Sequence, residues 1–344
     1  MGSIFSARQV YLPGKLLIVL IVLLILIVLI ILPILNLLKK MLSIIIISFN
    51  TRDTTLRCLR SVFAHLEGVG AEVIVVDNAS ADCSADAVAA EFPQVVLIRN
   101  PDNAGFGAAN NLAMTRAKGD VFLLLNSDAF LSAGALPAML KVLDDQPKVG
   151  MVGPRLLNAD GSLQRSCYRF PSPGVAWREA LWISALAPAA SFLGDLRKWP
   201  HDALYHPEWV VGACMMVRRS VYETVGGFDP KFFMYAEETD WQKRIRAAGW
   251  GIAFTPAAQV THLGGASGAD DKPKINTYFF SSGDYYYRKH HGSLGMHSAR
   301  AAMTVGTLLR LPLWGVMWLA LPKRRANLGA KMRLRMWLLR RTGG

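Results

Sequence analysis

The chain has 344 residues, enough for one sizeable catalytic core with appendages or at most two domains. Its formal net charge is +13, but residues 297–344 hold ten Lys and Arg and no Asp or Glu, so the remainder is close to neutral. Because this basic tail is mixed with Leu, Trp and Met, it suits an anionic membrane surface, and we expect no nucleic-acid partner. The four cysteines show neither metal-ligand spacing nor a dense disulfide pattern.

An unbroken apolar stretch lies near the N-terminus. Leu16–Leu35 consists almost entirely of Leu, Ile and Val, and twenty such residues span a bilayer core. Lys39 and Lys40 follow the stretch, which favours a cytoplasmic location for the rest of the chain. We therefore expect a single-pass protein of the inner membrane with a cytoplasmic catalytic domain. Translation from Met41 would remove the anchor, and the sequence leaves both starts open.

The C-terminal region is apolar and then basic. Ala301–Leu321 is interrupted by Arg310 and Pro312, so the sequence predicts an interfacial or re-entrant helix rather than a simple spanning one. A basic amphipathic stretch follows as far as Arg341. The alternative is a helix that packs against the core. The expected divisions are an anchor at 1–40, a catalytic domain at 41–296 and a membrane-associating tail at 297–344.

Strands alternate with helices in the first half of the core. Expected strands are Ser43–Ser48, Glu72–Val76, Val95–Ile98 and Val121–Leu125, and expected helices are Thr54–His65, Asp82–Phe92 and Phe106–Ala117. This alternation predicts an α/β fold with a doubly wound sheet, in which ligands bind beyond the carboxyl ends of strands. Those ends carry Asn50, Asp77 and Asp128.

The second half is less regular. We expect a strand at Val210–Val217, helices at Ser220–Val225 and Glu238–Ala248, and a strand at Ile252–Phe254 that leads to His262. The Pro/Ala-rich stretches Pro171–Pro173 and Ala185–Ala190 predict loops or a helical insertion.

Acidic residues and one histidine are the candidates for chemistry. Asp77 and Asp128 follow apolar strands, where a carboxylate can bind a ribose or a divalent ion, although both also suit ordinary turns. Glu237, Glu238 and Asp240 begin a helix behind an aromatic run, where crowding and desolvation raise a carboxyl pKa towards that of a useful base. Their simpler explanation is the helix dipole. His262 gains interest as a metal ligand only beside Asp128.

These segments appear in an order that resembles the family 2 glycosyltransferases with the GT-A fold, and among them the bacterial rhamnosyltransferase-like members. The segments are Ser48-Phe49-Asn50, Val75-Val76-Asp77-Asn78-Ala79-Ser80, Asn103-Ala104-Gly105-Phe106-Gly107, Leu125-Asn126-Ser127-Asp128, Gly226-Gly227-Phe228-Asp229, Phe232–Asp240 and His262. The resemblance covers the central 250 residues, about Leu42 to His290. It implies a GT-A-type fold with a mixed sheet.

The resemblance also implies roles. The nucleotide sugar would lie against Ser48, Asn50, Asp77, Asp82, Asn103, Gly105 and Asn126. Asp128 and His262 would hold Mg²⁺ or Mn²⁺, with Asn126 in place of the first Asp of the family's D-x-D motif. Glu238 would be the catalytic base, although the family usually has Asp there, and Glu237 and Asp240 could share its role. Gly212 and Ala213 would shape the acceptor side.

The implied reaction is an inverting glycosyl transfer in cell-surface glycan synthesis. The donor would be a dTDP- or UDP-linked sugar, with rhamnose suggested by the overall similarity, and the acceptor a polyprenyl-diphosphate-linked or polysaccharide glycan. An NAD(P)-dependent oxidoreductase is the alternative from another class. It fits less well because Asn110 replaces the third glycine of the dinucleotide fingerprint. A processive polysaccharide synthase is the mechanistic alternative.

Overall fold

The computed structural model describes residues 21–23, 25–26, 41–66, 68–186, 199–264 and 272–342. Most of the expected anchor at Leu16–Leu35 and most of the expected loop at Ala185–Ala190 therefore lie outside the described residues.

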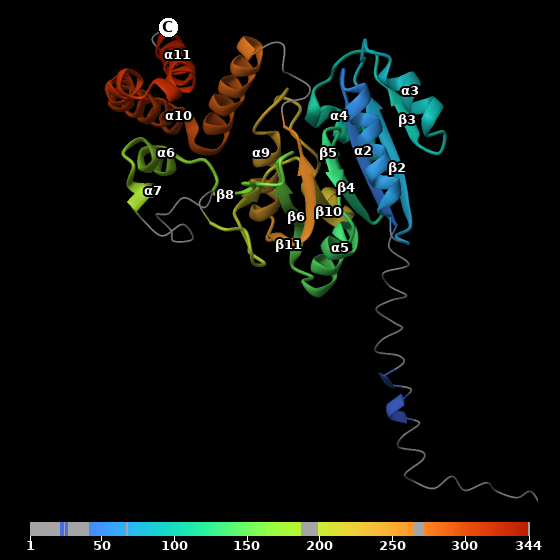
Figure 1. Cartoon of the computed structure of the whole chain (residues 1–344). Coiled ribbons are helices and arrows are strands. Elements are labelled where there is room, and N and C mark those ends of the chain that lie inside the picture. The colour runs from blue at the N-terminus through green and yellow to red at the C-terminus, as the bar shows by residue number, and fades with distance from the viewer. Residues whose placement is uncertain are drawn as a thin grey trace, which may run out of the picture.

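A nine-stranded sheet forms the centre of the molecule, in the order β3-β2-β1-β4-β10-β6-β11-β5 with β7 paired to β6 (Figure 1). Its strands are β1 (Leu42–Ser48), β2 (Ala71–Asp77), β3 (Val96–Arg99), β4 (Val121–Asn126), β5 (Ala129–Leu131), β6 (Val149–Leu157), β7 (Leu163–Gln164), β10 (Cys214–Arg218) and β11 (Gly251–His262). Strands β3, β2, β1 and β4 are parallel, whereas β10 and β5 run antiparallel to their neighbours. The expected mixed α/β sheet is confirmed.

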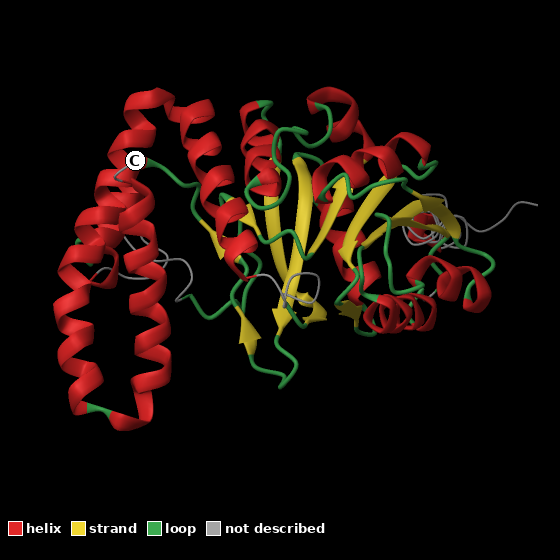
Figure 2. Ribbon diagram, turned by 90° about the horizontal axis from the view of Figure 1, so that it is seen from above, coloured by secondary structure: helices red, strands yellow, loops and turns green. Residues whose placement is uncertain are grey.

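Helices cover both faces of this sheet (Figure 2). One face packs against α2 (Arg52–Ala64), α3 (Ser84–Glu91) and α5 (Ala135–Asp145), and the other against α4 (Phe106–Arg116), α8 (Arg219–Val225) and α9 (Glu237–Ala247). Ile44 and Ile46 enter the first core and Ile45 the second, and all three are fully buried. Burial on both faces explains why β1 reads as a continuous isoleucine run, and each such side chain contributes about 1.5–3 kcal/mol.

One expected strand is wrong. The sequence predicts a single strand over Val210–Val217, but the structure has two short ones that belong to different sheets. β9 (Trp209–Val210) pairs with β8 (Cys167–Tyr168), and only β10 joins the main sheet. The chain turns between them, and the Val211 N–H bonds to the Ser166 carbonyl. Gly212 lies in this turn, and a glycine inside an apolar run is the signal for such a break.

The C-terminal part is helical. α10 (Lys272–Ala320) has a non-helical backbone at Gly292, a 3₁₀ turn (η3) follows at Pro322–Arg324, and α11 (Arg325–Thr342) packs back against α10 beside the sheet (Figure 2). α10 continues through Pro312 and across the expected boundary between residues 296 and 297. Within the described residues, Ile275–Ala320 is the helix long and apolar enough to cross a membrane, by length and composition only. The insertion forms two short helices: α6 (Pro173–Ala180) begins at the end of the first expected stretch, and α7 (Ile183–Leu186) reaches the start of the second.

Several polar strand ends meet at one edge of the sheet. The strands β1, β2, β4 and β11 point the same way, so their final residues Ser48, Asp77, Asn126 and His262 share that edge. Because β10 is antiparallel to β4, its first residues begin there too. The edge therefore gathers residues separated by more than two hundred positions in the sequence.

Candidate active site

Asp128 and His262 face each other at this edge. β5 pairs with the end of β11 so that Ala129 lies opposite His262, which brings Asp128 next to the imidazole. The Leu263 N–H also bonds to the Asp128 carbonyl at 3.0 Å. The His262 Nε2 atom lies 3.3 Å from Asp128 Oδ1, and both side chains are largely buried. The structure thus brings together the two residues expected to hold a metal.

Gln164, on β7, fixes the orientation of His262, and sequence reasoning missed it. Its Nε2 donates to Asn158 Oδ1 at 3.0 Å and to the His262 carbonyl at 3.1 Å, so the amide can point only one way. Its Oε1 then lies 2.7 Å from His262 Nδ1 and accepts a hydrogen bond from the Nδ1–H. In the neutral ring, the lone pair on Nε2 is therefore directed towards Asp128.

The Nε2 lone pair and Asp128 Oδ1 face each other across 3.3 Å, which is a spacing that a shared cation would fit. Two neighbouring ligands of an octahedral ion at about 2.1 Å would be about 3 Å apart, so the pair fits Mg²⁺ or Mn²⁺. Asn126 adds a buried Oδ1 without a hydrogen-bond partner, while its Nδ2 lies 3.5 Å from His262 Nε2. In the part of the chain that the structure describes, no group of three or more His, Cys, Asp or Glu forms a complete protein cage.

Glu238 packs against the turn that precedes β10. A Cβ atom placed on Gly212 would be 3.2 Å from Glu238 Cγ and 3.3 Å from its Cβ, so the carboxylate arm packs over the glycine backbone. The adjacent Ala213 carbonyl accepts the N–H of Asn126 at 2.9 Å. The presence of glycine at position 212 is thus explained by the close approach of Glu238.

Glu237 and Glu238 are unequal despite being adjacent. Glu237 is almost completely buried and its Oε2 has no hydrogen-bond partner. Burial, together with repulsion from Glu238, raises the pKa of Glu237 well above its usual range. Burial also raises the pKa of Glu238. Because the two carboxyls repel each other, both resist being ionised at once, and Glu238 is the more exposed of the pair.

Asp240 does not fit the shared base role that the sequence suggested. It is fully buried and pairs with Arg244 (2.9 Å), Lys289 (2.7 Å) and His290 (2.8 Å). Burial alone would raise the pKa of Asp240, but hydrogen bonds from His290, Lys289 and Arg244 outweigh it and lower that pKa to about 2. A carboxylate held so strongly in its ionised form is a poor proton acceptor, so its function is to join α9 to α10.

The loop that delivers the carboxylates is strained. Tyr235 and Ala236, directly before α9, have φ values of +70° and +65°, which non-glycine residues rarely adopt. α10 holds this loop in place, because Ser282 Oγ donates to the Met234 carbonyl at 2.8 Å and Phe233 stacks near Tyr278 with ring centroids 4.7 Å apart. The position of Glu238 therefore depends on α10.

On the nucleotide side, two loops are fastened together at the ends of β1 and β2. Asn50 Oδ1 accepts the Ala81 N–H at 2.7 Å, and Asp82 Oδ2 accepts the Arg52 N–H at 2.9 Å. Burial would raise the pKa of Asp82, but hydrogen bonds from Ser84 and Arg52 lower it overall. Asp77 Oδ2 accepts the Ser80 N–H, whereas its buried Oδ1 has no donor. That free acceptor suits an N–H of a base or a ribose hydroxyl.

The other expected nucleotide contacts are placed differently. Ser48 is fully buried, and its hydroxyl lies 3.1 Å from the hydroxyl of Thr55, so it supports the loop from below. Asn103 Oδ1 accepts the Gly105 N–H at 3.0 Å. Gly105 has φ +82°, and a Cβ there would collide with the Phe233 carbonyl. The nucleotide-side loop thus touches the loop that leads to Glu238.

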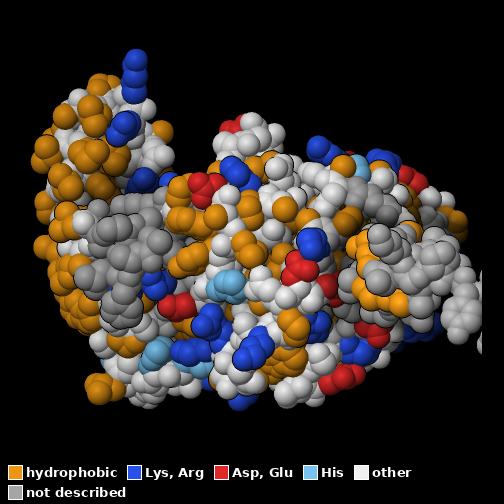
Figure 3. Space-filling model, turned by 90° about the horizontal axis from the view of Figure 1, so that it is seen from below, with side chains coloured by type: hydrophobic (Ala, Val, Ile, Leu, Met, Phe, Trp, Pro, Cys, Tyr) orange, Lys and Arg blue, Asp and Glu red, His pale blue; other side chains and the backbone are white. Residues whose placement is uncertain are grey.

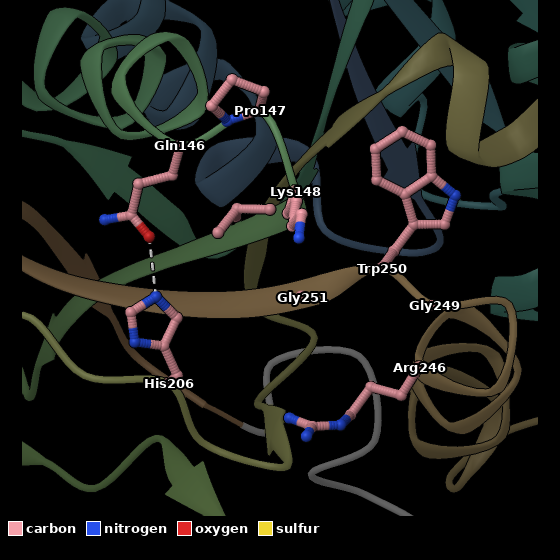
Figure 4. Close-up of a pocket in the computed structure, with 9 residues that line it drawn as sticks. Gln146, Pro147, Lys148, His206, Arg246, Gly249, Trp250 and Gly251 are labelled. Carbon is pink, nitrogen blue, oxygen red and sulfur yellow. Dashed lines mark hydrogen bonds between the residues drawn. The ribbon is translucent and has the colours of Figure 1, made fainter.

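The hollow drawn in Figure 4 is a different place. It measures about 680 Å³ and is lined by Gln146, Lys148, His206, Arg246 and Trp250 among others. It lies where β6 and β11 begin, whereas His262 lies where β11 ends. It therefore belongs to the opposite edge of the sheet from the site.

Comparison with known proteins finds related sequences. The chain is 29% identical over 215 residues to an N-acetylglucosaminyl-diphospho-decaprenol L-rhamnosyltransferase of Mycobacterium tuberculosis, covering 55% of this chain and 66% of that one. It is 27% identical over 259 residues to the O-antigen biosynthesis protein RfbC of Myxococcus xanthus, covering 72% and 20%. The chain thus spans less than two thirds of the length of these relatives.

The fold has counterparts among solved structures. The mannosyltransferase PcManGT from Pyrobaculum calidifontis, in complex with GDP-Man and Mn²⁺, superposes with a TM-score of 0.52 at 16% identity, covering 87% of this chain and 84% of that one. The expected GT-A-type fold is confirmed by this likeness. Residues 43–226, more than half of the chain, match the family model described as Glycosyl transferase family 2. The chain therefore belongs to the family 2 glycosyltransferases.

Proposed function

We propose that this enzyme transfers a sugar with inversion from a nucleotide-diphosphate donor to a lipid-diphosphate-linked glycan at the inner membrane, with its catalytic domain in the cytoplasm. Our working donor is dTDP-L-rhamnose. The name of the mycobacterial relative supports both the sugar and a polyprenol-linked acceptor, and that of RfbC supports a role in surface polysaccharide synthesis.

The observation that carries the proposal is the packing of Glu238 over Gly212, one residue from the backbone bond between Ala213 and Asn126. We propose Glu238 as the base because Asn126 links the Gly212–Ala213 turn to the strand end that leads to Asp128. When bound between Asp128 and His262, Mg²⁺ or Mn²⁺ would neutralise charge on the leaving diphosphate.

The chain's own residues perform the remaining steps. Glu238 takes the proton of the acceptor hydroxyl while the oxygen of that hydroxyl forms a bond to the anomeric carbon. The bond from that carbon to the diphosphate breaks on the opposite face, and the nucleoside diphosphate leaves with the electron pair. Asp77 and the Asn50 loop hold the nucleoside.

The test is a donor panel. Purified full-length enzyme would be given dTDP-rhamnose, UDP-sugars and GDP-mannose with membrane extract as acceptor, and nucleotide release and the anomeric configuration of the product would be measured. We expect Glu238→Gln to lower turnover by about 10²–10⁴-fold with binding of the nucleoside diphosphate intact. Glu223→Gln, at an exposed position on α8, is the matched control. Retention of configuration, or near-normal transfer by Glu238→Gln, would refute the mechanism.

A further inference from the structure

Two exposed apolar segments, more than 120 residues apart in sequence, lie in the C-terminal lobe. The first ends α6 and forms α7, and the second is the last third of α10. Their exposed apolar residues are Leu181, Trp182, Ile183, Leu186, Leu308, Leu309, Leu313, Val316, Trp318, Leu319 and Leu321. Figure 3 shows hydrophobic side chains gathered over this lobe, whereas charged and polar groups mingle over the rest of that face. Isolated exposed apolar residues are ordinary, but a continuous set of this kind marks an interaction surface.

Arg310 joins the two segments. Its guanidinium donates to the Ala180 carbonyl at 3.0 Å and to the Glu179 carbonyl, and it lies 4.4 Å from the centre of the Trp182 ring. At Gly306, one turn earlier, an added Cβ would be 3.0 Å from Ala180 Cα, so the backbones nearly touch. The Arg310 guanidinium therefore fastens α6 and α7 to α10, and α10 continues past it.

The charge of the same lobe identifies what would cover this surface. Residues 297–344 contain ten basic and no acidic residues, and Lys323 and Arg324 are exposed directly after the apolar end of α10. A second copy of the chain would bring two such tails together, and their repulsion opposes pairing. An anionic bilayer offers both an apolar layer and negative headgroups, and Trp182 and Trp318 suit the boundary between them.

We infer that α7 and the last third of α10 form one composite surface that inserts into the interfacial layer of an anionic phospholipid bilayer. This inference deepens the proposed function, which already places the enzyme at a membrane, by naming the surface and its lipid partner. The first part of α10 contacts the loop that carries Glu238, so the docked surface would set the distance of the active site from the bilayer.

The test uses the full chain in proteoliposomes of phosphatidylcholine with 30% phosphatidylglycerol. Three cysteines are buried, so a Cys83→Ser background leaves no exposed thiol in the described residues. Spin labels would be placed by Leu186→Cys on α7 and by Leu319→Cys on α10, whose native side chains are 89% and 66% exposed. Val96→Cys, on the far edge strand β3 and 46% exposed, is the matched control.

Power saturation compares collisions with oxygen, which concentrates in lipid, and with a water-soluble nickel complex. We expect several-fold greater oxygen than nickel accessibility at positions 186 and 319, the reverse at 96, and loss of the oxygen preference at 186 in pure phosphatidylcholine. If the label at position 186 were accessible to nickel while the label at position 319 was inserted in lipid, the composite surface would be overturned. Dipolar broadening at position 186, together with shielding from both reagents, would mean that a second copy of the chain covers this surface. That result would also overturn the proposed bilayer contact. Because no substrate is present, failure of the proposed transferase reaction is distinguishable from either result.

Discussion

Replacing Gly212 by Ala is a sharp test of Glu238, because it moves the proposed base without removing it. The backbone at Gly212 is not left-handed, so alanine is allowed there, but its Cβ would meet Glu238 Cγ at 3.2 Å and Cβ at 3.3 Å. These contacts require the glutamate to shift by a few tenths of an ångström. Since misplacement of a reacting group by about 1 Å can cost about 100-fold in rate, we expect kcat to fall by roughly 3–10-fold.

The assay is steady-state nucleotide release at saturating donor, with thermal unfolding of each variant as the check on folding. Gly70→Ala is the control, because nothing lies within 4 Å of a Cβ at that position and its backbone is also ordinary. It reports the general effect of exchanging glycine for alanine, which is about 0.4–1 kcal/mol of stability and no change in kcat. Introducing Gly212→Ala into a Glu238→Gln background completes a double-mutant cycle.

If Gly212→Ala acts through the base, it will cost no further activity once Glu238 is already Gln. A full 3–10-fold loss in that background would show that Gly212 acts through something else. An unchanged kcat in the single variant, with normal folding, would show that the position of Glu238 does not limit the reaction. Either result would refute the reasoning.

The remaining predictions concern the supports of the site. Replacing Gln164 by Met should weaken Mn²⁺ binding about 10–100-fold, as measured by Mn²⁺ EPR without substrate. Gln164→Glu should retain more affinity, because its carboxylate still accepts a hydrogen bond from His262 Nδ1. Equal affinity in the wild type and both variants would contradict the orienting role. The lowered pKa of Asp240 contributes stability that is present above the unfolded-state pKa of 3.8 and is lost as the pH falls to about 2. The difference in free energy of unfolding between wild type and Asp240→Asn should therefore narrow by about 2 kcal/mol over that pH range. A difference that stays constant with pH would contradict this prediction. Ala236→Gly should raise the free energy of unfolding by roughly 0.5–1 kcal/mol in urea titrations by relieving its left-handed backbone, and a loss of stability would show that no strain is stored there.

The first half of the fold is readable from the sequence because each local pattern agrees with its tertiary setting. The apolar run at Leu42–Ser48 is buried on both faces, so its lack of alternation is itself informative. Asp77 and Asp128 follow such runs directly, and parallel pairing then places them at the same edge. Position along one strand determines position in the site, which is why these residues could be predicted.

The break between β9 and β10 was not predicted, because hydrophobicity records burial but not the identity of the neighbouring strand. Val210 and Cys214 are equally buried, yet they belong to different sheets. The same limit applies to Arg310, whose partners the sequence does not indicate. A charged residue in an apolar stretch reads as an interruption, whereas its actual partners are the carbonyls of a segment that lies 130 residues earlier.

Gln164 shows where local reasoning stops for the chemistry as well. It occupies a two-residue strand, and its partner His262 is 98 positions away, so nothing in its neighbourhood distinguishes it from any other polar residue at a strand end. Its role follows from the combination of three contacts: two carbonyl-type acceptors fix the amide, the amide fixes the tautomer, and the tautomer directs a lone pair at Asp128. The side chains that meet at one sheet edge can therefore be predicted from strand ends, but the groups that orient them depend on pairings that only the antiparallel additions to the sheet create.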